Sequence, residues 1–294
     1  GEMRVLSFLP VCHIFERMLH YLYMYMGASI YFGESLETIK NDLNATQPIM
    51  FTAVPRLLEK FYDGIVAKGR AAGGVKTVIF NWALGVVLAW EPEKEGHGLY
   101  GFKLKMARKL VFSKVKEALG LTGIKAVASG SAALQARLAR FFNGAGIPVL
   151  EGYGLTETSP VVTVNTINAP EMLRIGTVGK VVQSVEISFG PDKEILVKGP
   201  NVMMGYYKDE EKTAEVIKDG WFHTGDIGEL DGDGFLRITD RKKEMFKTSG
   251  GKYVSPALLE NALKASLFIE QVMVVGEYRK HPAALISPDT TAIN

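Results

Sequence analysis

The 294 residues are 47% hydrophobic and 22% charged, a composition that indicates a packed globular protein and excludes a disordered or fibrous one. A chain of this length forms one large domain or two smaller ones. The formal net charge of +2 gives no electrostatic case for a nucleic-acid partner, and we expect none. Because Cys12 is the only cysteine, an internal disulfide is excluded and a reducing compartment is expected.

Strands and helices alternate along the first 66 residues. The predicted elements are a strand at 3–10, a helix reaching about residue 26, a strand at 27–32, a helix at 36–44, a strand at 51–55 and a helix at 56–66. Such alternation is typical of a parallel sheet covered by helices. His13 follows the first strand directly, so its side chain either lines a cleft at the strand end or caps the helix.

Residues 67–120 are predicted to be mostly helical, although glycines interrupt the pattern early. The apolar run at 78–90 is too short for a membrane span, which takes roughly 20 residues, so it predicts a buried helix or an interfacial patch. Several cations follow it and are suited to contact with an anionic surface. They are Lys103, Lys105, Arg108 and Lys109.

A strand, a helix and a second strand are predicted between residues 124 and 150. The first strand, at 124–128, runs into Ser129 and Gly130, and the second, at 147–150, runs directly into residue 151. The intervening helix is predicted from an N-cap, three apolar residues at helical spacing and a terminal glycine, namely Ser131, Leu134, Leu138, Phe141 and Gly144.

The segment EGYGLTETSP, at 151–160, has the residue types of a nucleotide site. Its glycines allow the backbone to approach a ligand closely, the tyrosine between them offers a flat face for stacking, and the Thr-Glu pair suits phosphate oxygens and a hard cation. By itself the pattern also fits a strand end followed by a helix cap. Because ligands bind outside the carboxyl ends of parallel strands, this segment and the Ser-Gly pair of the preceding strand should face one crevice. The residues concerned are Gly152, Tyr153, Gly154, Thr156 and Glu157.

From residue 176 onward, short alternating runs separated by Gly, Pro and Asp predict a small antiparallel sheet or barrel. The Asp-Gly-Asp-Gly sequence at 231–234 is a strong signal for a hairpin turn. Between two strand candidates lies GWFHTGD, at 220–226, whose Asp226 either accepts hydrogen bonds from both hydroxyls of a ribose or holds a turn.

A dense charge run, TDRKKE at 239–244, stands where the antiparallel pattern stops. Beyond it the sequence predicts a glycine loop, a capped helix and a strand. These comprise Gly250 and Gly251, the helix that Ser255 and Pro256 open and that reaches about Ala265, and residues 271–276.

These motifs, in this order, resemble the adenylate-forming superfamily, and within it the long-chain fatty-acyl-CoA synthetases. The resemblance extends over essentially the whole chain. It is carried by LPVCHIFER at 9–17, SGSAAL at 129–134, GYGLTE at 152–157, GWFHTGDIG at 220–228 and residues 240–256. It implies an α/β fold: a large AMP-binding domain at 1–239, with a mostly parallel sheet and helices at 1–175 and a small antiparallel β-barrel at 176–239. A hinge at Asp240 and the start of a small α+β C-terminal domain, at 240–294, would follow.

The resemblance also implies roles for single residues. Four would be catalytic: His13 beside the acyl and phosphate site, Thr156 on the α-phosphate, Glu157 on Mg²⁺ and Arg241 on ribose or phosphate. Tyr153 would stack on adenine in a pocket shaped by Ser129, Gly130, Gly152 and Gly154, Asp226 would take the ribose hydroxyls, and Gly250 and Gly251 would border the pantetheine tunnel of coenzyme A.

The activity implied is that of a long-chain fatty acid:CoA ligase, which forms acyl-AMP from ATP with Mg²⁺ and then transfers the acyl group to coenzyme A. Alternatives are an acyl carrier protein or aryl-acid ligase, or a non-catalytic nucleotide- or acyl-binding fragment. The phosphate loop and the C-terminal lysine of the family do not occur in these residues, so we expect a fragment that is inactive alone and binds AMP better than ATP. We expect a cytoplasmic location, with peripheral contact at the inner membrane face as the alternative.

Overall fold

The first of two compact units, Gly1–Gln183, is built on a seven-stranded sheet in the computed structural model. The structure describes residues 2–290 except 168, 265 and 267. The strand order is β2-β1-β3-β4-β5-β6-β7; neighbours from β2 to β5 pair in parallel, and β6 and β7 pair antiparallel, so the predicted mostly parallel α/β sheet is confirmed. The strands are β1 (Arg4–Ser7), β2 (Ser29–Phe32), β3 (Met50–Ala53), β4 (Ala126–Ser129), β5 (Val149–Gly154), β6 (Val161–Val164) and β7 (Lys180–Val181).

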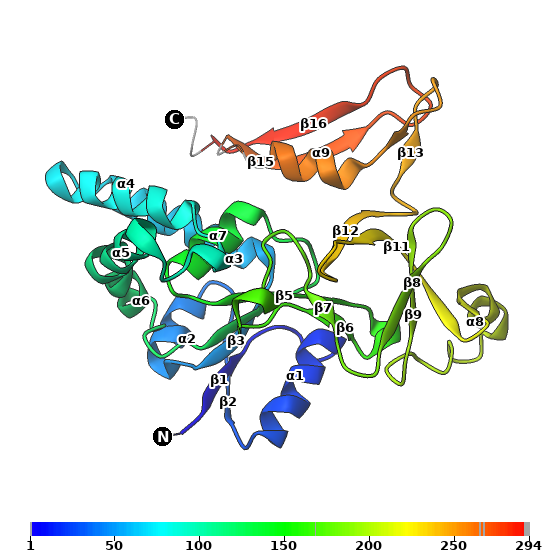
Figure 1. Ribbon diagram of the computed structural model, residues 1–294, viewed down its shortest axis with the longest axis horizontal. Helices are drawn as coiled ribbons and strands as arrows, with labels where there is room; N and C mark the ends of the chain where they lie inside the picture. The colour runs from blue at the N-terminus through cyan, green and yellow to red at the C-terminus, as the bar shows by residue number, and fades with distance from the viewer. Residues whose placement is uncertain (1, 168, 265, 267, 291–294) are drawn as a thin grey trace. The chain divides into compact units, whose positions relative to one another are not determined.

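Helices cover both faces of this sheet because successive side chains of a strand point to opposite faces. In β1, Val5 packs with Leu19 and Tyr23 of α1, whereas the neighbouring Leu6 belongs to the main core on the other face. Figure 1 accordingly shows α1 on one side of the sheet and α3 and α7 on the other. The helices next to the sheet are α1 (Ile14–Tyr25), α2 (Ile39–Thr46), α3 (Pro55–Arg70) and α7 (Ala136–Gly144).

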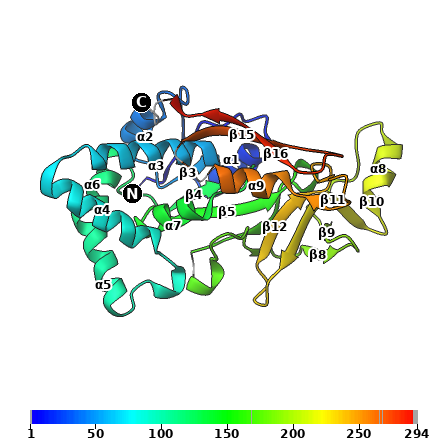
Figure 2. The ribbon, with the colours of Figure 1, turned by 90° about the horizontal axis from the view of Figure 1, so that it is seen from above.

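Three further helices, α4 (Gly74–Leu88), α5 (Gly98–Ala107) and α6 (Ser113–Ala118), lie together at one end of this unit (Figure 2). A π-helical turn, Arg108–Phe112, joins α5 to α6. The apolar run predicted as a buried helix or an interfacial patch forms most of α4, which buries Phe80, Leu84 and Val87 and exposes Val78 and Trp82. Within the described residues, no helix combines the length and the hydropathy that crossing a membrane requires.

The second unit, Ser184–Asn294, contains a five-stranded antiparallel sheet in the order β10-β11-β9-β8, with β12 beside β11. The predicted hairpin turn at 231–234 is confirmed, since Asp231 accepts hydrogen bonds from the backbone N–H groups of Asp233 and Phe235. The elements are β8 (Glu186–Phe189), β9 (Glu194–Lys198), α8 (Glu210–Val216), β10 (Ile217–Lys218), β11 (Trp221–Leu230) and β12 (Leu236–Arg241).

The last part of the second unit consists of two hairpins and one helix. Hairpin β13–β14 is followed by α9, which packs against β15 of the second hairpin. The predicted cap of α9 is confirmed, because Ser255 Oγ accepts from the N–H of Leu258 and Pro256 is the first helical residue. The predicted helix end near Ala265 lies outside the described residues. The elements are β13 (Phe246–Lys247), β14 (Tyr253–Val254), α9 (Pro256–Leu263), β15 (Ile269–Val275) and β16 (Ala283–Pro288).

Two predictions of local structure are wrong. Ser131 is not the N-cap of α7: it has a left-handed φ of +69°, and the helix begins after Gln135, so Leu134 is buried in the preceding loop. Asp226 does not lie between two strands, because β11 is continuous through it. The cause is Gly225, whose φ of +73° lies within a register shift against β9, so this glycine forms a bulge and does not end the strand.

Candidate nucleotide site

The carboxyl ends of β4 and β5 bring two predicted loops together in the first unit. Ser129 of β4 is paired with Glu151 of β5, and Gly130 follows at the strand end. A Cβ atom on Gly130 would lie 3.3 Å from the ring of Phe15, in the first turn of α1. The start of α1 and the two loops therefore meet at the edge of the sheet where parallel strands place ligands.

The loop after β5 has a conformation that only glycine at position 154 allows. A Cβ atom on Gly154 would overlap the carbonyl oxygen of Pro160, so the two backbone segments approach more closely than any other residue permits. Gly152 is less constrained, with 3.3 Å between an added Cβ and the carbonyl oxygen of Thr163. Tyr153 lies between them in β5 and is half-buried.

Thr158 fixes the shape of this loop, and the sequence interpretation missed it. Its fully buried hydroxyl accepts from the N–H of Leu155 at 2.9 Å and donates to the carbonyl oxygen of Pro160. Only one half of a capping box is formed, the bond from the Leu155 N–H to Thr158, because leucine has no side-chain acceptor. The usual Ser/Thr-x-x-Glu/Gln signature is therefore absent, and the sequence contains no signal for this role of Thr158.

Thr156 and Glu157 lie in the short 3₁₀ turn that this hydroxyl holds, Thr156–Thr158. Thr156 is exposed and Glu157 is half-buried. In the described part of the chain, no group of three or more His, Cys, Asp and Glu residues could hold a metal. Mg²⁺ in nucleotide enzymes is commonly bound by one or two carboxylates together with phosphates and water, so the single carboxylate of Glu157 fits this ion.

Two buried polar residues, Ser129 and Glu151, lie in the paired strands from which these loops continue. Burial raises the pKa of Glu151 to about 8, although the N–H of Leu134 donates to its carboxyl group and lowers the pKa in part. Ser129 is 2% exposed, and its Oγ has no hydrogen-bond partner among the described residues. Such an unpaired hydroxyl is unfavourable by about 1–3 kcal/mol, which a ligand or a bound water can offset. The sequence interpretation did not single out Glu151, because its burial is not visible in the motif.

His13 is the N-cap of α1. Its Nδ1 accepts from the N–H of Phe15 at 3.3 Å, and its side chain is exposed. With Nδ1 as the acceptor, the neutral ring carries its proton on Nε2. The residue thus has the capping position, which was one of the two roles open from the sequence, and presents an exposed N–H donor at the start of α1.

In the second unit, Asp226 and Arg241 face each other across β11 and β12. Arg241 Nε donates to Asp226 Oδ1 at 3.1 Å. The aspartate is 5% exposed, whereas the arginine side chain is 60% exposed. The carboxylate is therefore held by a neighbour that solvent reaches.

Glu194, on β9, organises the backbone beside Asp226 and was missed from the sequence. One carboxylate oxygen accepts from the N–H of Gly225 at 2.9 Å, and the other accepts from Lys242 Nζ at 3.1 Å and lies 3.3 Å from Nδ1 of His223. Burial raises the pKa of Glu194, but the hydrogen bonds from Lys242, Gly225 and His223 outweigh it and lower the pKa.

The proposed hinge residue, Asp240, is buried next to Arg241. Its Oδ1 accepts from the N–H of Arg241 at 2.7 Å, and its Oδ2 is buried with no partner among the described residues. Gly250 and Gly251 lie in the turn between β13 and β14, which the N–H of Gly251 closes on Thr248 at 2.9 Å. Gly251 has a φ of +79°, which favours glycine, and no atom lies within 4 Å of a Cβ placed on it.

Two family models match the chain. The model of the AMP-binding enzyme matches residues 1–207, and that of the AMP-binding enzyme C-terminal domain matches residues 244–294. The long-chain-fatty-acid–CoA ligase FadD15 of Mycobacterium bovis is 40% identical over 99% of this chain and 48% of its own length. The long chain acyl-CoA synthetase 3 of Arabidopsis thaliana is 37% identical over 98% of this chain and 45% of its own length. The chain thus spans about half the length of the curated relatives it matches.

Solved structures share the fold at low identity. The A domain of carboxylic acid reductase from Segniliparus rugosus, in complex with AMP and a co-purified carboxylic acid, has a TM-score of 0.72 at 22% identity, over 98% of this chain and 43% of its own. The o-succinylbenzoate-CoA synthetase of Bacillus subtilis, in complex with AMP, has a TM-score of 0.69 at 22% identity, over 98% of this chain and 51% of its own. The predicted resemblance is confirmed, and the chain belongs to the AMP-binding enzyme family.

Proposed function

We propose that the protein to which these residues belong is a long-chain fatty acid:CoA ligase that works through an acyl-adenylate. The observation that carries the proposal is the loop after β5, at the carboxyl edge of a mostly parallel sheet. Its backbone segments approach each other closely at Gly154, and the hydroxyl of Thr158 fixes its conformation by hydrogen bonds. Relatives named as long-chain fatty acid ligases, at up to 40% identity over nearly all of this chain, support the acid and the acceptor.

In this proposal the two loops at the carboxyl ends of β4 and β5 bind the adenine, the α-phosphate and the metal. Tyr153 stacks on the base, in a pocket to which Ser129, Gly130, Gly152 and Gly154 contribute backbone and small side chains. Thr156 donates its exposed hydroxyl to the α-phosphate. Glu157 holds Mg²⁺, which neutralises phosphate charge when it is bound.

Asp226 and Arg241 would bind the ribose. Asp226 accepts hydrogen bonds from the two ribose hydroxyls, since a carboxylate has lone pairs left after the bond from Arg241. Arg241 contacts ribose or phosphate with its exposed guanidinium. We further propose a domain division at Asp240, whose buried Oδ2 has no hydrogen-bond partner among the residues that the structure describes and would gain one when the hinge turns. A pantetheine path beside Gly250 and Gly251 is also proposed.

The reaction would take two steps. A fatty-acid carboxylate oxygen attacks the α-phosphorus of ATP, and the bond to pyrophosphate breaks. The thiol of coenzyme A then attacks the acyl carbonyl carbon, loses its proton and displaces AMP. Both steps build negative charge on oxygen, so the N–H donor of His13, the hydroxyl of Thr156 and the guanidinium of Arg241 would accelerate them by electrostatic stabilisation.

A second adenylating function keeps the first step and changes the acid or the acceptor. The Bacillus subtilis neighbour is named for an aryl acid, o-succinylbenzoate, but that likeness, at 22% identity, concerns the fold alone. An acyl carrier protein as acceptor leaves the nucleotide residues unchanged. A cytoplasmic location and peripheral contact at the inner membrane face remain predictions.

A substrate panel on the full-length protein tests the function. AMP release is measured with ATP, Mg²⁺ and fatty acids of graded length, with an aryl acid as the control substrate, and with coenzyme A and acyl carrier protein as alternative acceptors. We expect the highest kcat/KM with long-chain acids and coenzyme A. Higher values with the aryl acid or the carrier protein would favour the alternatives, and no AMP release with any acid would refute an adenylating enzyme.

A further inference from the structure

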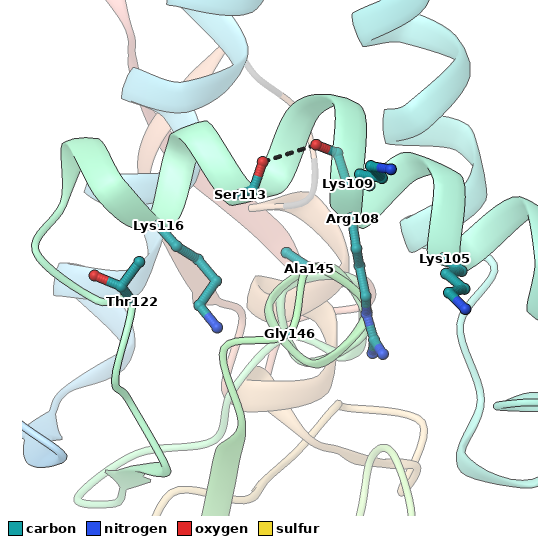
Figure 3. Close-up of a pocket in the computed structure, with 8 residues that line it drawn as sticks. All are labelled: Lys105, Arg108, Lys109, Ser113, Lys116, Thr122, Ala145 and Gly146. Carbon is teal, nitrogen blue, oxygen red and sulfur yellow. Dashed lines mark hydrogen bonds between the residues drawn. The ribbon is translucent and has the colours of Figure 1, made fainter.

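A cationic pocket lies in the first unit between the segment made of α5, the π-helical turn and α6 and the turn that joins α7 to β5. Its volume is about 370 Å³, within the range of small-ligand sites. Four cations line it together with two hydroxyl residues and a backbone turn (Figure 3). The lining residues are Lys105, Arg108, Lys109, Lys116, Ser113, Thr122, Ala145 and Gly146.

The pocket is distinct from the nucleotide site. Thr122 precedes β4 and Gly146 precedes β5, whereas Ser129 and the Gly152–Glu157 loop stand at the carboxyl ends of the same strands. In a parallel sheet these two ends lie on opposite edges. A ligand in the pocket therefore does not touch the residues proposed to bind ATP.

Arg108 has a structural role in the fold, whereas the three lysines of the pocket have no such role in the described contacts. Arg108 Nε and Nη2 donate to the carbonyl oxygens of Gly144 and Asn143, at 2.8 and 3.0 Å, and so cap the end of α7, while Nη1 pairs with Glu95. By contrast, no carboxylate lines the pocket, and in the described part of the chain no ion pair is formed by Lys105, Lys109 or Lys116.

Lys116 is partly buried, and it lies near the charged Arg108. Burial, and then the guanidinium of Arg108, lower the pKa of its ammonium group. Figure 3 shows Arg108 and Lys116 extending from the helical segment on either side of the Ala145–Gly146 turn, with Lys105 further along the same segment. The π-helical turn between them, a feature often found at functional sites, sets how these side chains are aligned.

We propose that this pocket binds a phosphate group, carried by a soluble phosphorylated ligand or by a lipid headgroup. A phosphate accepts hydrogen bonds from several ammonium groups at once and removes their mutual repulsion. The hydroxyls of Ser113 and Thr122 line the same pocket. Exposed Leu99, Phe102 and Leu110 on α5 and the π turn provide apolar surface on the same elements, which a membrane-borne phosphate would use.

The test uses the full-length protein, saturated with AMP so that the nucleotide site is occupied, at about 0.15 M ionic strength. Inorganic phosphate is titrated calorimetrically into the wild type, K105Q/K116Q and K103Q/K114Q. The second double variant is a matched control, because Lys103 and Lys114 are exposed on the same two helices and do not line the pocket. We expect K105Q/K116Q to lose about tenfold or more in phosphate affinity and the control to change less than about twofold.

A vesicle arm distinguishes the sources. Cosedimentation with phosphatidylglycerol vesicles, against phosphatidylcholine vesicles, should fall selectively in K105Q/K116Q if the phosphate belongs to a lipid, and should be equal in both double variants if it is soluble. Thermal unfolding with and without inorganic phosphate checks that both variants fold. If both double variants lose phosphate affinity and vesicle binding equally, the attraction is a non-specific effect of net charge and the proposal is overturned. It is also overturned if neither variant loses phosphate affinity or vesicle binding.

Discussion

Arg241 Nε donates a hydrogen bond of 3.1 Å to Asp226 Oδ1, and the two residues face each other in neighbouring strands of the second unit. This bond orients a carboxylate that is 5% exposed and leaves it lone pairs for further donors. The proposed ribose contact is therefore prepared by a strand pairing that is independent of any ligand.

Asp226→Asn should weaken AMP binding to the full-length protein by at least about tenfold. The amide keeps the shape but loses the charge, and a hydrogen bond to a charged group contributes about 1.5–3 kcal/mol. Calorimetric titration with AMP measures the loss. Glu229→Gln, an exposed acid on the same strand, is the control and should leave the affinity unchanged. Equal affinity in Asp226→Asn and wild type would remove Asp226 from the ribose site.

Gly154→Ala should destabilise the protein by about 2 kcal/mol or more and abolish adenylation, because its Cβ overlaps the carbonyl oxygen of Pro160. Gly64→Ala provides the contrast. Gly64 is exposed within α3, no atom lies within 4 Å of its added Cβ, and alanine should stabilise the helix by about 0.5–1 kcal/mol. Denaturant unfolding and AMP release are the measurements. A Gly154→Ala protein with wild-type activity would contradict the closed loop.

Thr158→Val tests whether the conformation of the loop after β5 determines AMP affinity, since Thr158 itself is buried and is not proposed to contact the nucleotide. Valine has nearly the same volume but cannot accept from the half-buried Leu155 N–H or donate to the carbonyl oxygen of Pro160, and the loss of these bonds should cost about 1–3 kcal/mol. AMP affinity should fall as well, although Thr158 is fully buried. Thr158→Ser restores the hydroxyl and should recover most of both losses. If valine lowers stability while AMP affinity stays unchanged, the hydroxyl does not position the nucleotide.

The fold was predictable where one local pattern determines the structure, and not where distant segments do. Alternating strands and helices, the turn at 231–234 and the Ser255–Pro256 cap all follow from short-range preferences. Gly225 was misread because a bulge depends on the register of the partner strands. Ser131 was misread because its left-handed backbone is set by the loop that carries it to α7.

The site was predictable to a similar degree. The glycine and hydroxyl residues of the loop after β5 are visible in the motif, since their chemistry belongs to the residue types themselves. Glu194 was not, because its role comes from a hydrogen bond to Gly225, which lies 31 residues further along the chain. Burial that only tertiary packing creates is likewise invisible in a linear sequence.

His13 has two roles that one substitution can separate. Asparagine is a good N-cap and replaces the acceptor that Nδ1 supplies to Phe15, but it has no imidazole N–H. His13→Asn should therefore keep the stability within about 0.5 kcal/mol of wild type and lower kcat about 100-fold if the ring stabilises charge during adenylation. Pyrophosphate exchange by the full-length enzyme measures it. Wild-type exchange in His13→Asn would leave the histidine a helix cap alone.

Glu151 should make stability depend on pH in an unusual direction. Its pKa is raised to about 8 in the folded protein, mainly by burial, whereas in the unfolded chain it lies near the ordinary value of 4.5. Between these values the folded state holds a proton that the unfolded state has lost, so stability decreases as pH rises, by about 1.4 kcal/mol per unit. Below pH 4.5 both states are protonated and this loss is absent; above pH 8 both are ionised and it grows no further.

Glu151→Gln mimics the protonated acid and should remove that slope. In denaturant titrations of the full-length protein at pH 5, 6, 7 and 8, the variant should gain on the wild type by about 1.4 kcal/mol per unit. The amide can still accept from the N–H of Leu134, so the loop before α7 should keep its shape and AMP affinity at pH 6 should be unchanged. Parallel stability curves for the two proteins would mean that Glu151 is ionised in the fold, and a loss of AMP affinity at pH 6 would mean that glutamine disturbs the loop itself.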